Sequence, residues 1–231
     1  MGKYDSKGTY AGYNKNNKER AEADFYSTPP EEVTNILNQL NIEFLEWDTI
    51  LEPCCGAGHM VKGIVDYLDE NNYKPRIIGA DIKDRGLASF WDEFKGKKIT
   101  FYQDEEKCDF LNPNYDINNF CIEVPDYVII NPPFSTLEYF INKGYDIAKK
   151  GLLVLCRLQA LETKSIYENI FKDIPPSDVY VYVDRITCAK NANEAIKGNG
   201  VQAYCWLWFN RLGAPKRETK LHWITSAKYK K

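Results

Sequence analysis

The tetrapeptide Asn131-Pro132-Pro133-Phe134 combines the polar groups and the stiffness needed to act on a flat aromatic amine. The nitrogen of such an amine is a poor nucleophile because its lone pair is delocalised into the ring. The side-chain oxygen of Asn131 and the carbonyl of Pro132 offer two acceptors for its N–H groups, and the prolines keep that backbone stiff. Phe134 supplies a flat face for a base that has left its stack. The plain alternative is a turn that ends a strand.

A glycine-containing turn, residues 54–58, follows an apolar segment and precedes a helical pattern. A turn between a strand and a helix gathers backbone amides into a binding cradle at the carboxyl edge of a sheet. Gly56 and Gly58 match only two of the three glycines of a dinucleotide fingerprint, because Val61 occupies the third position. Glu52 precedes these glycines and gives nothing to a pyrophosphate, whereas a ligand with an ammonium group would gain from it.

A second carboxylate, Asp81, ends the next apolar segment, residues 76–82. A carboxylate at this place suits the two hydroxyls of an adenosine ribose, although an Asp in a loop turn is the structural alternative. Together, Glu52 and Asp81 indicate a cationic ligand that carries adenosine and no phosphates. S-adenosylmethionine is such a ligand.

The elements that position these residues alternate between strand and helix along the chain. The expected strands are 49–53, 76–82, 98–102, 126–130, 152–158, 179–183 and 204–209; helices are expected after residue 28, after residue 61, over 136–149 and over 161–171. This alternation predicts an α/β fold with a mostly parallel sheet and helices on both faces. The last two strands have no helix between them, so they are expected to pair antiparallel at the sheet edge. Thr28 is expected to cap the first helix.

Length and composition indicate one ordinary globular domain. The 231 residues include 44% hydrophobic and 27% charged side chains, which excludes wholesale disorder and a coiled-coil rod. No apolar run reaches the roughly 18 residues that span a bilayer, and the first residues lack the apolar core of a secretion signal. Seven cysteines and two histidines show no metal-ligand spacing. We therefore expect reduced thiols, no metal and a cytoplasmic protein.

Charge divides the chain into three parts, although the formal net charge is only −3. We expect a flexible basic arm over residues 1–24, one domain over 25–213 and a basic tail over 214–231. The overall charge argues mildly against a nucleic-acid partner, whereas the basic segments could contact phosphates. The candidates for such contacts are Lys190, Lys197, Lys216 and Arg217.

On these motifs the chain resembles the class I S-adenosylmethionine-dependent methyltransferases. The 131–134 motif is similar to that of the DNA amino-methyltransferases, Asp/Asn/Ser-Pro-Pro-Tyr/Phe, and its Asn and Phe point to adenine N6. Residues 157–162, 174–181 and 203–209 resemble the small adenine methyltransferases of phages and prophages. The chain departs from that group at Ala160, where phenylalanine is expected, and over 205–208.

The resemblance implies a Rossmann-like class I methyltransferase fold and assigns roles to further residues. Asp109 is expected to accept from the adenine amino group of the cofactor, and Phe110 to pack on its ring. Residues 25–30 resemble a motif that folds over the methionine end. The implied cofactor-binding residues are Phe25, Thr28, Glu52, Pro53, Cys54, Gly56, Gly58, Asp81, Ile82, Asp109, Phe110 and Asn131, and the implied catalytic residues are Asn131, Pro132, Pro133 and Phe134.

The expected activity is transfer of a methyl group to the N6 amine of adenine in DNA, by a monomer or weak dimer in a bacterium or the host of a phage. Methylation of RNA adenine or of a protein amide remains open, and so does an inactive protein that binds S-adenosylmethionine and a partner. Cytosine C5 methylation is excluded, because residues 131–134 contain no cysteine nucleophile. For Arg157, pairing with Glu162 and a role at the site are equally open.

Overall fold

The computed structural model describes residues 26–86, 90–112, 115, 124–190, 202–212 and 218–229. The strands are β1 (Tyr26–Ser27), β2 (Thr49–Glu52), β3 (Arg76–Asp81), β4 (Ile99–Gln103), β5 (Tyr127–Ile130), β6 (Gly151–Arg157), β7 (Asp178–Tyr182), β8 (Ala189–Lys190), β9 (Tyr204–Asn210) and β10 (Lys220–Ile224). The helices are α2 (Pro30–Leu40), α3 (His59–Glu70), α4 (Trp91–Phe94), α5 (Leu137–Ile147) and α6 (Lys164–Ile166), which continues as a π-helical turn, η6 (Tyr167–Phe171). Short 3₁₀ turns are η4 (Phe134–Thr136), η5 (Leu158–Glu162) and η7 (Ala227–Tyr229).

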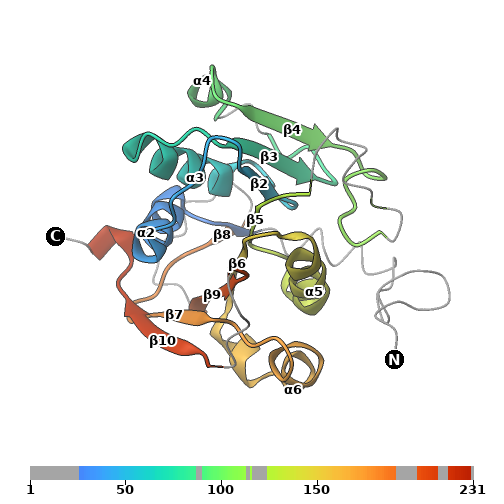
Figure 1. Cartoon of the computed structure of the whole chain (residues 1–231), viewed down its shortest axis with the longest axis vertical. Helices are drawn as coiled ribbons and strands as arrows, with labels where there is room; N and C mark the ends of the chain where they lie inside the picture. The colour runs from blue at the N-terminus through green and yellow to red at the C-terminus, as the bar shows by residue number, and fades with distance from the viewer. Residues whose placement is uncertain are drawn as a thin grey trace.

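Eight of the described strands form one sheet in the order β10-β7-β9-β6-β5-β2-β3-β4 (Figure 1). Among them only β9 runs against the others, because it is antiparallel to both β6 and β7, and β10 is parallel to β7. The predicted α/β fold with a mostly parallel sheet is therefore confirmed. The expected antiparallel pairing of the last two predicted strands is confirmed by β7 and β9, but the edge of the sheet is formed by β10, which was not predicted.

Helices cover both faces of this sheet, as the alternation of elements predicts. α2 and α3 lie on one face, and α5 and α6 on the other (Figure 1). Successive side chains of a strand point to opposite faces; accordingly, Ile50 and Ile77 belong to the core under α2 and α3, whereas Leu51 and Ile78 belong to the core under α5. No helix within the described residues is long and apolar enough to cross a membrane.

The C-terminal residues that the structure describes belong to the domain, which corrects the expectation of a separate tail over 214–231. β10 extends the sheet beyond β7. Asn35 donates through Nδ2 to the carbonyl of Thr225 (2.8 Å), and the N–H of Ala227 donates to Glu32 Oε1 (3.0 Å). These bonds tie the end of the chain to α2. The expected arm over 1–24 lies outside the described residues.

α2 and α3 pack closely at Gly63, and this contact holds the two chain segments that directly precede these helices. A Cβ atom at Gly63 would lie 2.3 Å from the carbonyl oxygen of Pro30 and 2.6 Å from Cβ of Val33. No side chain fits there, so the first turn of α2 lies directly against α3. The chain before α2 and the glycine turn before α3 are thereby held relative to each other.

Gly63→Ala is expected to lower the free energy of unfolding by about 1–3 kcal/mol, because the added methyl group forces the two helices apart. Urea denaturation followed by circular dichroism measures this change. The control is Glu70→Ala at the exposed end of α3, which should leave the midpoint nearly unchanged. Equal midpoints for Gly63→Ala and wild type would contradict the close contact.

Candidate active site

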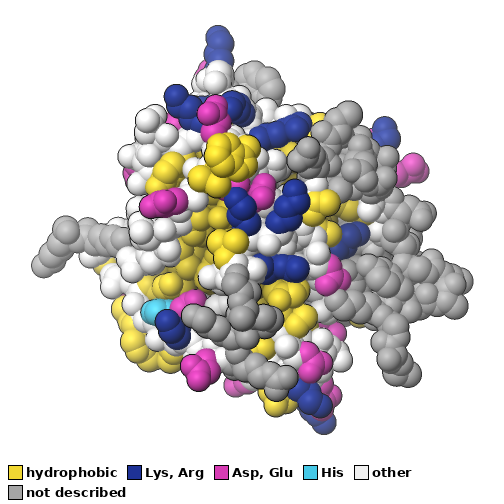
Figure 2. All heavy atoms as spheres, viewed as in Figure 1, with side chains coloured by type: hydrophobic (Ala, Val, Ile, Leu, Met, Phe, Trp, Pro, Cys, Tyr) yellow, Lys and Arg dark blue, Asp and Glu magenta, His cyan; other side chains and the backbone are white. Residues whose placement is uncertain are grey.

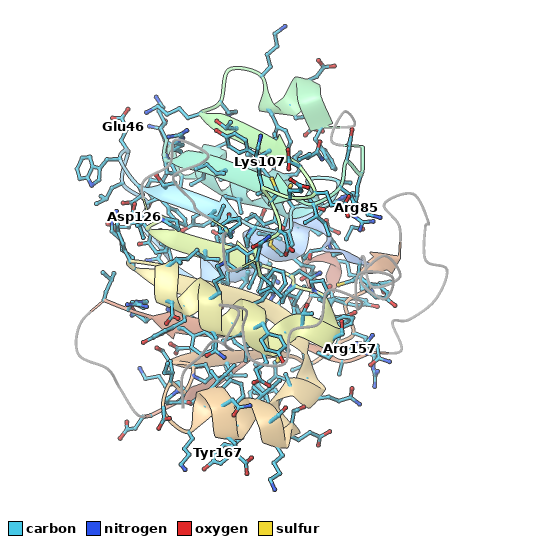
Figure 3. All side chains as sticks on the ribbon, turned by 90° about the vertical axis from the view of Figure 1, so that its right-hand side faces the viewer. Glu46, Arg85, Lys107, Asp126, Arg157 and Tyr167 are labelled. Carbon is cyan, nitrogen blue, oxygen red and sulfur yellow. The ribbon has the colours of Figure 1, made fainter. Side chains whose placement is uncertain are left out.

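A pocket opens where the carboxyl ends of β2, β3 and β5 meet, with a volume of about 1020 Å³ counted out to open solvent. Ten of the predicted site residues line it: Thr28, Glu52, Pro53, Cys54, Asp81, Ile82, Asp109, Phe110, Asn131 and Pro133. Figure 3 shows Arg85 and Arg157 on this side of the molecule, opposite Glu46 and Asp126, which lie where the strands begin. Most of the predicted site residues that the structure describes therefore meet in one pocket at the carboxyl edge of the sheet.

The glycine turn shapes one wall of the pocket. Gly56 and Gly58 have φ angles of 54° and 87°, in the left-handed region that favours glycine. The N–H of Gly56 donates to Asp81 Oδ2 at 2.8 Å, and the N–H of Cys55 donates to the carbonyl of Ala80 at 2.9 Å. The end of β3 thus fixes the turn that follows β2.

Glu52 is a buried carboxyl group with an unsatisfied oxygen. Its side chain is 2% exposed, and Oε2 has no hydrogen-bond partner among the described residues. Burial, and then the nearby charge of Asp81, raise the pKa of Glu52 well above its usual value. A buried acceptor without a partner is costly. The pocket therefore suits a ligand that brings a donor or a positive charge to Glu52.

Asp81 is engaged by the backbone but keeps capacity to accept further bonds. Besides the bond from Gly56, its Oδ1 accepts from the N–H of Lys83 at 2.9 Å. Burial raises the pKa of Asp81, although its backbone hydrogen bonds act in the opposite direction. Each carboxylate oxygen can accept more than one hydrogen bond. Asp81 can therefore hold the glycine turn and still accept from the hydroxyls of a ligand.

The segment after β4 brings Asp109 and Phe110 to the pocket, as expected. Asp109 Oδ1 accepts from the N–H of Leu111 at 3.3 Å, and the ring of Phe110 stacks on Phe140 with centroids 5.3 Å apart. Phe110 is almost fully buried, so only part of the ring can meet a ligand.

Lys143 supports this segment and was missed from the sequence. Its Nζ donates to the carbonyl of Asn112 at 3.1 Å and lies 4.6 Å from the ring centre of Tyr115. Burial lowers the pKa of Lys143 to about 8. A signal was present, because Lys143 lies on the same helical face as the apolar Phe140 and Gly144.

Asn131 is held by two hydrogen bonds that fix the direction of its amide. Its Nδ2 donates to the carbonyl of Tyr26 at 2.9 Å and to Thr28 Oγ1 at 3.0 Å. Within the described residues its Oδ1 accepts no hydrogen bond, and neither does the carbonyl of Pro132, whereas the carbonyl of Pro133 accepts from Thr136. Two neighbouring acceptors therefore stay available beside the pocket.

Thr28 does not cap α2, in contrast to the expectation from the sequence. α2 begins at Pro30 with Pro29 at its N-cap position and no side-chain cap, whereas the hydroxyl of Thr28 accepts from Asn131. Thr28 thus connects the chain before α2 to the end of β5.

Phe134 lies next to the pocket but does not line it. Its ring centre is 5.5 Å from that of Tyr26 and 6.3 Å from that of Tyr204. The guanidinium carbon of Arg157 lies 3.7 Å from the centre of the same ring. No ion pair with Glu162 occurs among the described residues, so Arg157 belongs to the surroundings of the tetrapeptide.

The remaining candidate residues lie outside the described part of the chain. These are Phe25, Lys197, Lys216, Arg217 and the side chain of Lys190, whose backbone pairs with Tyr26 in β1–β8. Among the other pocket residues, Tyr26, Ser27, Cys55 and Ala57 lie inside the predicted motifs 25–30 and 54–58, and those missed from the sequence are His59, Met60, Arg85, Cys108, Leu111, Thr136 and Phe140. Most of the missed residues lie within a few positions of a motif residue. This closeness in the sequence was the only signal that could have identified them as pocket residues.

Several solved structures share this fold. A protein from Listeria monocytogenes, described as a class I S-adenosylmethionine-dependent methyltransferase, matches over 94% of this chain and 69% of its own, with a TM-score of 0.62 and 16% identity. The methyltransferase subunit of a type I restriction-modification system from Streptococcus thermophilus matches over 91% of this chain, with a TM-score of 0.63 and 12% identity. This chain spans 50% of that subunit.

A third structure shows that the fold alone does not identify the acceptor. A protein from Agrobacterium tumefaciens, described as an O-methyltransferase, matches over 86% of both chains, with a TM-score of 0.52 and 11% identity. No protein-family model and no curated protein matches the sequence. The chain therefore has the Rossmann-like class I methyltransferase fold, as predicted, and its chemistry has to be argued from the site.

Glu52→Gln is expected to make the free protein more stable at neutral pH. Because the pKa of Glu52 is raised in the folded state, its ionisation opposes folding increasingly as the pH rises above the unfolded value of 4.5. Urea denaturation at about pH 4 and about pH 7 should show little difference between variant and wild type at the lower pH and a more stable variant at the higher one. Glu70→Gln, at an exposed position, is the control. A difference that does not grow with pH would contradict a buried, unpaired Glu52.

Proposed function

We propose that this chain transfers a methyl group from S-adenosylmethionine to the exocyclic N6 amine of adenine in DNA. The observation that carries this proposal is the arrangement of Asn131. Its amide nitrogen is engaged by Tyr26 and Thr28, which leaves Oδ1 and the neighbouring carbonyl of Pro132 as acceptors for the two N–H groups of one amine. A turn that merely ended β5 would not require this orientation.

The pocket suits the proposed cofactor. The unsatisfied oxygen of Glu52 provides an acceptor for an ammonium group, and Asp81 provides one for ribose hydroxyls. Asp109 and Phe110 are the residues proposed to meet the adenine. When bound, S-adenosylmethionine supplies a methyl group activated by a sulfonium. The fold shared with the Listeria monocytogenes protein, which is described as an S-adenosylmethionine-dependent methyltransferase, supports the assignment.

The proposed contribution of the protein is alignment and preorganised acceptors. As the amine nitrogen becomes tetrahedral its N–H groups become stronger donors, and Asn131 and Pro132 accept from them without first having to reorganise. Phe134 provides the flat face that supports a base outside its stack. No general base needs to act early, because positive charge develops on the nitrogen only as the new bond forms.

Nucleic acid is the proposed partner because of the polar groups beside the tetrapeptide. A hollow that begins at Leu158, directly after Arg157, is lined by Gln159, Glu162, Arg185 and Gln202, which are side chains of the kinds that contact base edges. Figure 2 shows Lys and Arg side chains close together across the middle of one face. Lys190, Lys197, Lys216 and Arg217 remain proposed phosphate contacts. A cytoplasmic monomer or weak dimer is proposed with them.

Asp81→Asn is expected to weaken S-adenosylmethionine binding about tenfold, because the amide replaces a charged acceptor of hydroxyl groups. Isothermal titration calorimetry measures the affinity. Asp84→Asn, three residues further along the exposed loop, is the matched control and should bind like wild type. Unchanged affinity in Asp81→Asn would mean that the adenosine binds in another part of the pocket.

Asn131→Ala is expected to lower the rate of methyl transfer at least about 100-fold, because one preorganised acceptor at the reacting nitrogen is lost. Turnover is measured with adenine-containing DNA and radiolabelled S-adenosylmethionine. Binding of the cofactor should stay nearly unchanged, since Glu52 and Asp81 are untouched. The matched control is Asn169→Ala, which removes a surface contact with Glu138 and should retain full turnover.

Wild-type turnover in Asn131→Ala would mean that the tetrapeptide is only a turn. If the wild-type protein binds S-adenosylmethionine but methylates neither DNA, RNA nor protein, the reading as an inactive binding protein replaces the proposal.

A further inference from the structure

Arg157 covers the aromatic ring on which a target base would stack. It ends β6, and its guanidinium carbon lies 3.7 Å from the ring centre of Phe134. This separation is van der Waals contact, so no base fits between the two groups. Tyr26 and Tyr204 lie against the same ring. A base that uses the face now under Arg157 must therefore displace the guanidinium.

The stacked guanidinium is weakly anchored to the rest of the protein. Its Nε is buried and has no hydrogen-bond partner among the described residues. Those residues also provide no ion pair for Arg157, although Glu162 lies only five positions along the chain. A structural arginine normally satisfies its planar set of donors. Among the described residues, the contact with the ring of Phe134 is thus the main interaction of Arg157, and leaving it breaks no hydrogen bond to any of them.

Space and polar groups are available directly beside this contact. The hollow that begins at Leu158 has a volume of about 850 Å³ counted out to open solvent. It is lined by η5, by Arg185 after β7 and by Gln202 before β9. Arg157 therefore lies between the ring of Phe134 and Leu158, the residue at which this hollow begins.

We propose that Arg157 holds the place of the target base on Phe134 in the free protein and exchanges this contact for a phosphate when a nucleotide enters. The inference rests on the proposed function. An aromatic ring accepts either a cation or a base on its face. Once displaced, a guanidinium can bind a phosphate of the same nucleic acid through paired N–H groups. Arg157 would thereby admit a base only when it is attached to a phosphate backbone.

The test compares two probes that differ in phosphate content, with the cofactor pocket filled by S-adenosylhomocysteine. Arg157→Ala should bind the nucleoside 2-aminopurine riboside about fivefold more tightly than wild type, because the ring is no longer covered. The same variant should bind a single-stranded, adenine-containing oligonucleotide more weakly, with a salt slope reduced by about one. Tighter binding of the nucleoside together with weaker binding of the oligonucleotide is the result that this inference predicts.

Two further variants separate this role from simple alternatives. Arg185→Ala also removes a positive charge beside the hollow, so it should weaken oligonucleotide binding without tightening nucleoside binding. Arg157→Lys keeps the charge and should restore most of the oligonucleotide affinity. Thermal denaturation verifies that each variant is folded.

Equal or weaker nucleoside binding by Arg157→Ala would overturn the inference, because the ring contact would then be structural. Methylation assays on the wild-type protein distinguish this result from failure of the proposed function. If wild type methylates adenine in DNA while Arg157→Ala binds the nucleoside no more tightly than wild type, only the inference about Arg157 is wrong. If wild type methylates no nucleic acid, the proposed function and this inference both fail.

Discussion

The two hydrogen bonds donated by the amide nitrogen of Asn131 connect the parts of the candidate site that are most distant in sequence. They join the end of β5 to Tyr26 and Thr28, which immediately precede α2. α2 is in turn fixed against α3 at Gly63, and α3 carries the glycine turn at its start. One side-chain amide thus links the tetrapeptide, the wall formed by the N-terminal segment and the cradle for the proposed cofactor. Because the same bonds engage the amide nitrogen, the side-chain oxygen of Asn131 is the atom left to accept a hydrogen bond from a substrate.

Electrostatics in the pocket impose a second constraint. Glu52 and Asp81 are both buried, and the charge of Asp81 adds to the effect of burial on the pKa of Glu52. Asp81 is stabilised by the N–H groups of Gly56 and Lys83, whereas one oxygen of Glu52 has no such partner. The free protein therefore carries an unfavourable group that a cationic ligand would relieve. This asymmetry agrees with a cofactor that has an ammonium group and no phosphates.

The parts of this structure that follow from local pattern could be predicted from the sequence. Glu52, Asp81 and Asn131 each end an apolar strand, and parallel strands bring their carboxyl ends to one edge. The position of β10 could not be predicted, because its pairing with β7 depends on tertiary contacts such as that between Asn35 and Thr225. Thr28 looked like a helix cap, but a partner 103 residues away competes for its hydroxyl. The contact of Arg157 with Phe134 likewise joins the end of β6 to the start of η4, which no sequence motif relates.

The central claim is that adenine N6 receives the methyl group. The most direct measurement incubates the wild-type protein with DNA and S-adenosylmethionine carrying a deuterated methyl group, digests the DNA to nucleosides and analyses them by mass spectrometry. We expect the label in N6-methyldeoxyadenosine and in no cytosine derivative. Label confined to another base or to protein, or absent from every acceptor while the cofactor is bound, would contradict the account.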